Sequence, residues 1–251
     1  MELIDTHAHL DQVEDLEGAL KRAVEAEVTT VIAVSVDLES CKRTLEISEY
    51  FSSNKIKIYP ALGVHPWGLQ TENLEDSYRV VEENIERAVA IGEVGLDFWL
   101  PKAKEAEFRD LQISVLQHFI GLAEEYDKPL LLHTRGAWKE AYEIVSESGL
   151  SRVIFHWFSG STNTLLKIVR DGYYISASPA AEYSKAHRNA ISKAPLENVV
   201  LETDSPVRYK GEVSEPSFLI KSLNAVAEIK DVDRERVAEV TTENAKEIFD
   251  L

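Results

Sequence analysis

Short runs of apolar or β-branched residues alternate along the chain with longer segments in which apolar residues recur every three to four positions. The short runs are typical of β-strands and comprise residues 2–6, 29–36, 57–62, 89–94, 129–133, 153–156, 173–178 and 198–202. The longer segments predict amphipathic helices at residues 16–26, 38–51, 76–87, 105–125, 138–147, 162–170, 184–193, 215–228 and 234–249. Strand and helix are therefore expected to alternate throughout.

The character of these segments predicts an α/β fold. A continuous apolar run such as Leu130-Leu131-Leu132 suits a strand that is buried on both faces, as in a parallel sheet covered by helices. Eight β/α units within 251 residues predict a (β/α)8 TIM barrel that forms a single domain over residues 1–251. A doubly wound open sheet is the alternative, because periodicity does not show whether the last strand pairs with the first.

Composition narrows the class of protein. The chain is 44% hydrophobic and contains no Gly/Ser-rich linker, which excludes a disordered or collagen-like chain. Cys41 is the only cysteine, so an intrachain disulfide framework and a cysteine-based zinc site are excluded, and a cytoplasmic location is expected. The amino terminus lacks a signal-peptide pattern and no apolar stretch approaches the ~18 residues of a membrane span, so no membrane partner is expected.

Polar residues with metal-binding or catalytic chemistry end most of the predicted strands. Catalytic residues of a TIM barrel lie at the carboxyl ends of its strands. The residues found there are His7, His9, His65, Glu93, His133, His156 and Asp204. Singly, His133 and His156 are better explained as hydrogen-bonded core histidines, but the joint position of all these residues at one end of a sheet favours a metal centre.

The spacing of these residues indicates how metal ions would be held. His7 and His9 are two positions apart on a strand and can present two imidazoles to one ion, although an isolated pair of this kind is equally often solvated. Four imidazoles and two carboxylates can hold two divalent ions if one carboxylate bridges them. Glu93 is the candidate bridge, because flanking glycines allow close approach. Asp204 is a candidate ligand, with a turn or cap residue as the alternative.

Six short motifs resemble the TatD family of metal-dependent nucleases, which belongs to the amidohydrolase superfamily of TIM barrels. They are residues 3–11 (LIDTHAHLD), 63–66 (GVHP), 91–97 (IGEVGLD), 132–135 (LHTR), 155–160 (FHWFSG) and 201–206 (LETDSP). The resemblance implies that one metal ion is held by His7, His9, Glu93 and Asp204. It implies that Glu93, His133 and His156 hold the other, and that His65 lies near the site as a substrate-binding or supporting residue.

One segment departs from the family pattern. After Pro206, where members usually show Arg-Gly and then Asn-Glu-Pro, this chain has Tyr209-Lys210-Gly211 and reaches Pro216. Lysine lacks the bidentate fork with which arginine contacts phosphate, so the substrate class is left open at this point.

Charge bears on the substrate as well. With 27 Lys and Arg residues against 44 Asp and Glu residues, the formal net charge is −17, which opposes nucleic acid at long range. Two divalent ions and the loop residues Arg135, Arg208 and Lys210 would reverse the field locally, and these three side chains are candidate phosphate contacts. Short or single-stranded DNA ends are therefore expected as substrates in preference to long duplexes.

The predicted activity is hydrolysis of a DNA phosphodiester. Two divalent ions, of zinc, manganese or magnesium, can activate a water molecule and stabilise charge on phosphoryl oxygens. Asp204 is the candidate general base and Glu93 the bridging catalytic residue. The alternatives are a metal-dependent ester or amide hydrolase, including one acting on aminoacyl-tRNA esters, and a non-catalytic binding module stabilised by metal.

Other aromatic residues and histidines complete the set of candidates. Three of the four tryptophans closely follow motif residues, so one of Trp67, Trp99, Trp138 and Trp157 can stack on a nucleobase at the rim. Packing in the core or at the rim is the simpler interpretation of each. His118 and His187 are expected to be solvated and without a role.

Overall fold

The computed structural model describes residues 1–69, 71 and 73–251. Within these residues, eight strands form one parallel sheet in which each strand pairs with the next along the chain. The strands are β1 (Leu3–Ala8), β2 (Val28–Val34), β3 (Lys57–Leu62), β4 (Ala90–Gly95), β5 (Leu130–His133), β6 (Val153–Phe155), β7 (Tyr174–Ala177) and β8 (Val199–Leu201). Their bounds lie within two residues of those predicted.

The first and last strands meet and close the sheet into a barrel. Ala8 forms a parallel bridge with Ser205, which follows β8. The N–H of His9 donates to the carbonyl of Ser205 at 2.8 Å, and the N–H of Asp204 donates to the carbonyl of His7 at 2.8 Å. The (β/α)8 prediction is therefore confirmed, and the open doubly wound sheet is wrong.

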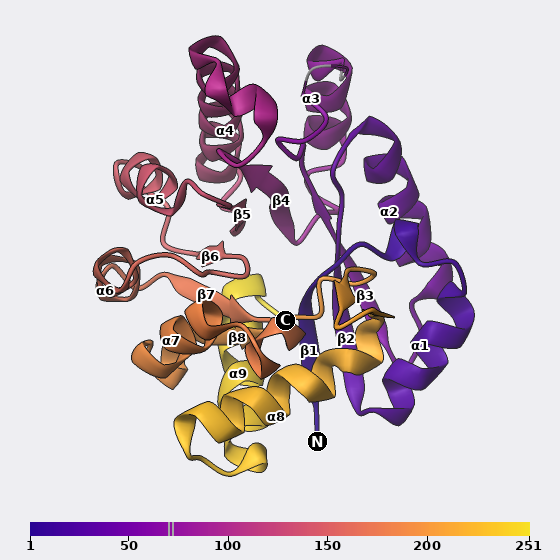
Figure 1. The fold of residues 1–251 in the computed structure, drawn as a ribbon. Coiled ribbons are helices and arrows are strands. Elements are labelled where there is room, and N and C mark those ends of the chain that lie inside the picture. Colours follow the sequence, from indigo (N-terminus) through magenta and orange to yellow (C-terminus); the bar gives the residue numbers. More distant parts are fainter. Residues whose placement is uncertain (70, 72) are drawn as a thin grey trace.

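Helices surround the barrel, as Figure 1 shows. They are α1 (Leu16–Glu25), α2 (Leu38–Phe51), α3 (Leu74–Glu83), α4 (Ala106–Glu125), α5 (Trp138–Ser146), α6 (Thr162–Arg170), α7 (Lys185–Lys193), α8 (Leu219–Lys230) and α9 (Arg234–Phe249). Within the described ranges, no helix is long and apolar enough to cross a membrane.

Two helices differ from the predicted bounds for local reasons. α3 begins two residues early because the side chain of Asn73 caps it, accepting a hydrogen bond from the N–H of Asp76. It also ends at Glu83, four residues before the predicted end. α8 begins at Leu219 because Pro216–Phe218 form a 3-10 turn before it. A short antiparallel hairpin of β9 (Arg208–Tyr209) and β10 (Glu212–Val213), which the hydrophobic pattern did not predict, precedes that turn.

Each strand is buried on both faces, because alternate residues enter two separate cores. On β5, Leu130 and Leu132 pack against the surrounding helices, whereas Leu131 points into the barrel. The barrel interior also contains Ile248 and Phe249 of α9, which cover its amino-terminal end. Apolar side chains therefore fill the amino-terminal end of the interior, and the candidate ligands lie at the carboxyl ends of the strands.

Candidate metal centre

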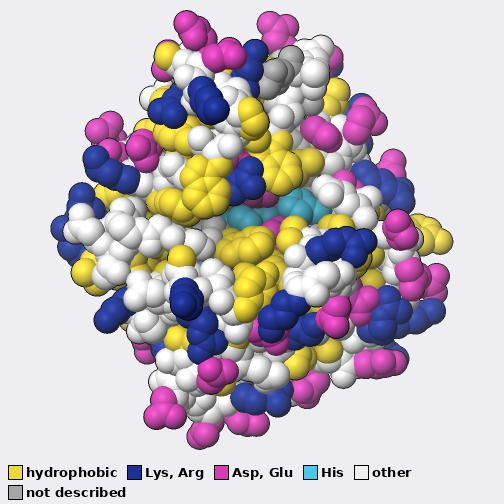
Figure 2. All heavy atoms as spheres, in the orientation of Figure 1, with side chains coloured by type: hydrophobic (Ala, Val, Ile, Leu, Met, Phe, Trp, Pro, Cys, Tyr) yellow, Lys and Arg dark blue, Asp and Glu magenta, His cyan; other side chains and the backbone are white. Residues whose placement is uncertain are grey.

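Six predicted ligand side chains converge at the carboxyl ends of the strands, and none is more than 8% exposed. They come from β1 and the residue after it, from β4, and from the ends of β5, β6 and β8: His7, His9, Glu93, His133, His156 and Asp204. Figure 2 shows histidine side chains at the bottom of a hollow in the middle of this face, with hydrophobic side chains beside them.

The backbone has positive φ values at two strand ends that carry candidate carboxylate ligands. Gly95 has φ +147°, and a Cβ atom there would lie 2.0 Å from the carbonyl oxygen of His133, so only glycine lets β4 approach β5 this closely. The close neighbour of this glycine is thus the β5 backbone, which agrees with the close approach expected of a glycine beside Glu93. Asp204 has φ +51°, a conformation that aspartate adopts more readily than most residues.

The first group of candidate ligand atoms surrounds one oxygen of Glu93. Its Oε2 lies 3.2 Å from Nε2 of His7 and 3.5 Å from Nε2 of His9. Oδ1 of Asp204 lies 3.8 Å and 3.4 Å from the same two nitrogen atoms. Tetrahedral bonds of about 2.0–2.2 Å place ligand atoms roughly 3.3–3.6 Å apart. The four separations, from 3.2 to 3.8 Å, are close to this range.

The second group surrounds the other oxygen of Glu93. Its Oε1 lies 2.8 Å from Nδ1 of His133, 3.6 Å from Nε2 of His65 and 4.0 Å from Nε2 of His156. Nε2 of His156 also lies 3.7 Å from Oδ2 of Asp204. The two oxygens of Glu93 thus face different sets of imidazoles, which is the arrangement that the bridging prediction requires.

His65 lies deeper in the centre than a residue that merely contacts substrate. It forms, with Glu93 and His133, a buried group whose ligand atoms all lie within 4.8 Å of one another. Its ring centroid is 4.2 Å from that of His133. The structure therefore adds His65 to the candidate metal ligands.

Two buried carboxylates that the sequence analysis left without a role orient the candidate ligands. Oε2 of Glu202 lies 2.8 Å from Nδ1 of His156, and Oδ2 of Asp97 lies 3.1 Å from Nε2 of His133. Carboxylates in this position fix the tautomer and orientation of metal-binding imidazoles. Both residues belong to motifs that contain a candidate ligand, and that proximity was the available signal.

The carboxylates of the centre are held in their anionic form. Burial alone would raise the pKa of Glu93, but the imidazoles of His65 and His7 hold it well below its usual range. Burial opposes ionisation of Asp204 in the same way, and the nearby His156 lowers the pKa of that carboxyl below its ordinary value. Two buried negative charges in one cluster require neighbouring cations, which are either protonated imidazoles or metal ions.

The imidazoles cannot all supply that charge as protonated rings. Burial disfavours the charged form of His156, but Glu202 and Asp204 outweigh this effect and raise its pKa to about 10. Burial and the neighbouring His156 lower the pKa of His7, whose ring stacks on that of His156 with centroids 3.9 Å apart. Because metals bind neutral imidazole, metal ions and protons compete for these nitrogens.

The side chains present fit divalent metal ions. The candidate ligand atoms are imidazole nitrogens and carboxylate oxygens. This set suits zinc or manganese, and its carboxylates also allow magnesium.

The three predicted phosphate contacts lie at different distances from this centre. The Nε–H of Arg135 donates to Oδ2 of Asp97 at 2.8 Å, which connects it directly to a residue that orients His133. Arg208 and Lys210 lie on the β9–β10 hairpin, where Arg208 donates to the carbonyl of Gly211 and Nζ of Lys210 lies 3.3 Å from Glu182. Of the three, Arg135 is therefore the one that shares a hydrogen-bond partner, Asp97, with a candidate ligand.

The hairpin is joined to the barrel beside the centre. The buried Tyr209 donates its hydroxyl hydrogen to the carbonyl of Thr203 at 3.0 Å. Thr203 in turn contacts the buried Asp5 through its N–H at 2.9 Å and its hydroxyl at 2.5 Å, and burial raises the pKa of Asp5 to about 8. Arg208 and Lys210 therefore flank a residue attached close to Asp204.

The expectation that His187 is solvated is wrong. This imidazole is fully buried, its Nδ1 lies 2.9 Å from the carbonyl of Phe158, and its Nε2 accepts the N–H of Ser178 at 3.1 Å. These contacts connect α7 to the loops after β6 and β7. His118, by contrast, is half-buried and stacks on Tyr78 with ring centroids 3.7 Å apart.

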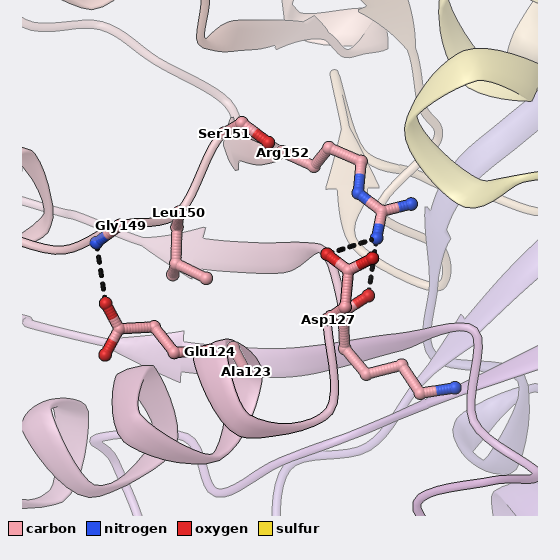
Figure 3. A pocket seen from close by; sticks show the side chains of 8 residues that line it. Ala123, Glu124, Asp127, Gly149, Leu150, Ser151 and Arg152 are labelled. Atoms are coloured by element: carbon pink, nitrogen blue, oxygen red, sulfur yellow. Dashed lines mark hydrogen bonds and ion pairs between the residues drawn. The ribbon is translucent and has the colours of Figure 1, made fainter.

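A separate hollow of about 230 Å³ lies at the opposite end of the barrel, before β5 and β6 (Figure 3). Its polar groups already contact one another: the N–H of Gly149 donates to Glu124 at 2.6 Å, and Arg152 pairs with Asp127 at 3.0 Å. Lys128 donates to the carbonyl of Ala88. Among the described residues, each of these charged side chains therefore already has a hydrogen-bond or ion-pair partner.

Buried imidazoles and carboxylates at the carboxyl end of a TIM-like barrel define a metal-dependent hydrolase. The family model described as TatD related DNase matches residues 4–250, and the chain belongs to this family. The resemblance drawn from the six motifs is thereby confirmed.

Individual relatives agree with this assignment. The chain is 33% identical over 261 residues to the human protein named deoxyribonuclease TATDN3, covering 98% of this chain and 94% of the relative. It is 31% identical to the uncharacterized metal-dependent hydrolase YabD of Bacillus subtilis, covering 98% of both. Among solved structures, it resembles YJJV, a TatD homolog from Escherichia coli, with a TM-score of 0.90, 27% identity and coverage of 99% and 98%.

Proposed function

We propose that the protein is a two-metal phosphodiesterase that hydrolyses DNA at ends or in single strands. The observation that supports this most directly is the position of Glu93, whose two oxygens face separate sets of imidazoles 2.8–4.0 Å away. A carboxylate between two such sets suits a centre that holds two ions close together, as in enzymes that displace phosphoryl groups. The DNA substrate is suggested by the family and by the name of the human relative.

The residues that would hold each ion follow from the contacts around Glu93. His7, His9 and Asp204 with one oxygen of Glu93 would hold the first ion. His133, His156 and the other oxygen of Glu93 would hold the second, with His65 beside them. When bound, divalent ions in this position would acidify a water molecule and neutralise charge on the phosphoryl oxygens.

The side chains of the centre then carry out the remaining tasks. Asp204 is anionic, and we assign it as the base that accepts a proton from the attacking water. Asp97 and Glu202 keep the His133 and His156 rings in fixed orientations, so that the reacting atoms meet without reorganisation. The guanidinium of Arg135, which is 41% exposed at the mouth, contacts a substrate phosphate.

The net charge of the chain selects among DNA substrates. Arg208 and Lys210 add positive charge beside the centre, but the protein as a whole carries a formal charge of −17. A long duplex would bring many phosphates against the acidic surface, whereas a short end or single strand brings only a few to the mouth. We therefore assign single strands and ends as the preferred substrates.

Hydrolysis assays with three kinds of substrate test this proposal. Protein loaded with zinc, manganese or magnesium, and protein treated with EDTA, are incubated with labelled single-stranded DNA, duplex DNA and simple esters. Metal-dependent release of nucleotides, faster from single strands, is the expected result. No release with any of the three metals would contradict the proposed phosphodiesterase.

A second candidate function is hydrolysis of a carboxylic ester or amide, including an aminoacyl-tRNA ester. The observation in its favour is the altered hairpin, in which Lys210 lies 3.3 Å from Glu182 and so offers less charge to a phosphate. Ester turnover together with intact DNA in the same assays would favour this candidate. Inactivity on every substrate, with metal bound, would favour a binding module stabilised by metal.

A further inference from the structure

We propose that Trp67, with Arg135 beside it, is a stacking surface for one unpaired nucleobase next to the phosphate that is cleaved. This inference rests on the proposed function and specifies which feature of DNA the site selects. According to this inference, the exposed indole of Trp67 at the mouth of the candidate metal centre makes the protein prefer nucleotides whose base is free to leave the helical stack.

Two tryptophans at the mouth expose large aromatic surfaces to solvent. Trp67 follows β3 and is 58% exposed, and Trp99 follows β4 and is 65% exposed. Both come after strands whose carboxyl ends carry the candidate ligands. An indole left in water forgoes the free energy of burial, so its exposure beside a reactive centre points to a ligand that covers it.

Trp67 is fixed in place by the same residue that orients a candidate metal ligand. Its indole N–H donates to Oδ2 of Asp97 at 2.6 Å, and Asp97 also contacts His133. The Trp67 ring centroid lies 4.7 Å from that of His65 and 6.1 Å from that of His133. A nucleobase that stacks on this indole therefore lies within about the width of one aromatic ring of the candidate ligands.

Arg135 and the glycine after it lie between the two exposed indoles. The Arg135 guanidinium carbon is 5.3 Å from the Trp67 ring centroid, within the range of a cation–π contact. Gly136 has φ +74°, and a Cβ atom there would lie 2.3 Å from Cδ1 of Trp99, so glycine allows that indole to pack on the backbone. The edge of Trp99 also packs against Trp138, with ring centroids 5.7 Å apart.

This combination matches a nucleotide better than a simple phosphate ester. A nucleobase offers a flat face to the indole, and the attached phosphate offers a charge to the guanidinium. A base within a duplex is stacked on both sides and paired, so it would have to leave the helix to reach Trp67. The surface therefore favours unpaired ends, independently of the net charge of the protein.

Abasic substrates test this inference directly. Single-stranded oligonucleotides are prepared with every base present, or with a tetrahydrofuran abasic residue at the last or the penultimate position. For the wild-type protein, kcat/KM is expected to fall about tenfold when the base is missing at one of these positions. Equal kcat/KM for the intact and both abasic substrates would overturn the inference even if DNA is hydrolysed well.

Substitutions then show whether Trp67 is responsible. Trp67→Leu removes the ring together with the N–H that contacts Asp97, so the diagnostic quantity is the ratio of kcat/KM on the intact strand to kcat/KM on the abasic strand. This ratio is expected to fall about tenfold, mainly through KM on the intact strand. Trp67→Phe keeps a ring but loses the N–H that contacts Asp97, so it is expected to retain the preference for the base. Equal losses on intact and abasic strands in both variants would show a positioning role for Trp67 and overturn the stacking inference.

Controls separate this inference from the proposed function and from misfolding. Tyr50→Leu removes an aromatic side chain that is 83% exposed near the end of α2, and should change neither substrate preference nor rate. Bound metal is measured in each variant. If the wild-type protein hydrolyses no DNA with any metal, the proposed function fails, whereas hydrolysis that ignores the base rejects only the stacking surface.

Discussion

Glu93 and His133 lie on neighbouring strands, and Oε1 of the first is 2.8 Å from Nδ1 of the second. Strands β4 and β5 can come this close because Gly95 lies opposite His133 in the register of the sheet. The other oxygen of Glu93 faces His7 from β1, on a different side of the barrel. One carboxylate thereby connects two sets of imidazoles whose strands do not pair with each other.

Glu93→Gln should remove activity and reduce metal binding at both positions, because an amide is a weaker ligand than a carboxylate and cannot bridge two cations. Loss of several kcal/mol of charge stabilisation corresponds to a fall in kcat of about 10³-fold or more. Metal content by mass spectrometry and kcat are the measurements. Glu86→Gln, at an exposed position, is the control. A variant that retains two ions per chain would contradict the bridging role.

Glu202→Gln should weaken metal binding without unfolding the protein. The carboxylate that holds Nδ1 of His156 at 2.8 Å would become an amide, which fixes the tautomer of the ring less strongly. Metal affinity is expected to fall about 10–100-fold, as for other residues that support metal ligands. Isothermal titration calorimetry, in which metal is added to the metal-free protein, measures this affinity. Unchanged affinity would show that His156 needs no support from Glu202.

Asp204→Asn separates its two proposed tasks. If Asp204 accepts the proton of the attacking water, the variant should lose the acidic limb of the dependence of kcat/KM on pH, in addition to losing rate. The measurement is a pH–rate profile at saturating metal, compared with that of the wild-type protein. A slow variant that keeps the wild-type profile would leave Asp204 as a ligand only.

The buried His187 should make the protein less stable in mild acid. Burial lowers its pKa from an ordinary value of 6.5 to about 4, so the folded protein keeps it neutral while the unfolded chain takes up a proton. The contribution of the neutral ring to the free energy of unfolding is fully present above pH 6.5 and is lost as the pH falls towards about 4. The total loss is about 3 kcal/mol. Urea unfolding in EDTA should show a smaller decline over this range for His187→Gln. An equal decline in both proteins would exclude His187 as the cause.

Phe249→Ala should destabilise the fold while leaving the metal centre intact. Phe249 is buried and belongs to the α9 segment that covers the amino-terminal end of the barrel, opposite the candidate ligands. A cavity of this size costs about 3–5 kcal/mol of the free energy of unfolding. Chemical denaturation and metal titration are the two measurements, with the partly exposed Leu251→Ala as control. A large loss of metal affinity at unchanged stability would contradict this separation.

The sequence by itself determined the order and kind of the secondary structure. Apolar periodicity is a local property, because a strand buried on both faces and a helix buried on one face each impose it on neighbouring residues. The same local order placed the candidate ligands near strand ends, since each lies within three residues of the end of its apolar run. Helix bounds depend in addition on capping side chains, as the start of α3 directly after its Asn73 cap shows.

Only the tertiary structure decided which of these residues meet. Closure depends on contacts between Ala8 and Ser205, which lie almost two hundred positions apart, and no periodic pattern encodes such a pairing. The supporting carboxylates Asp97 and Glu202, and the burial of His187, likewise arise from contacts between distant segments. Local sequence fixes the direction of a strand and its faces, whereas the distances between side chains on different strands follow from how the whole barrel packs.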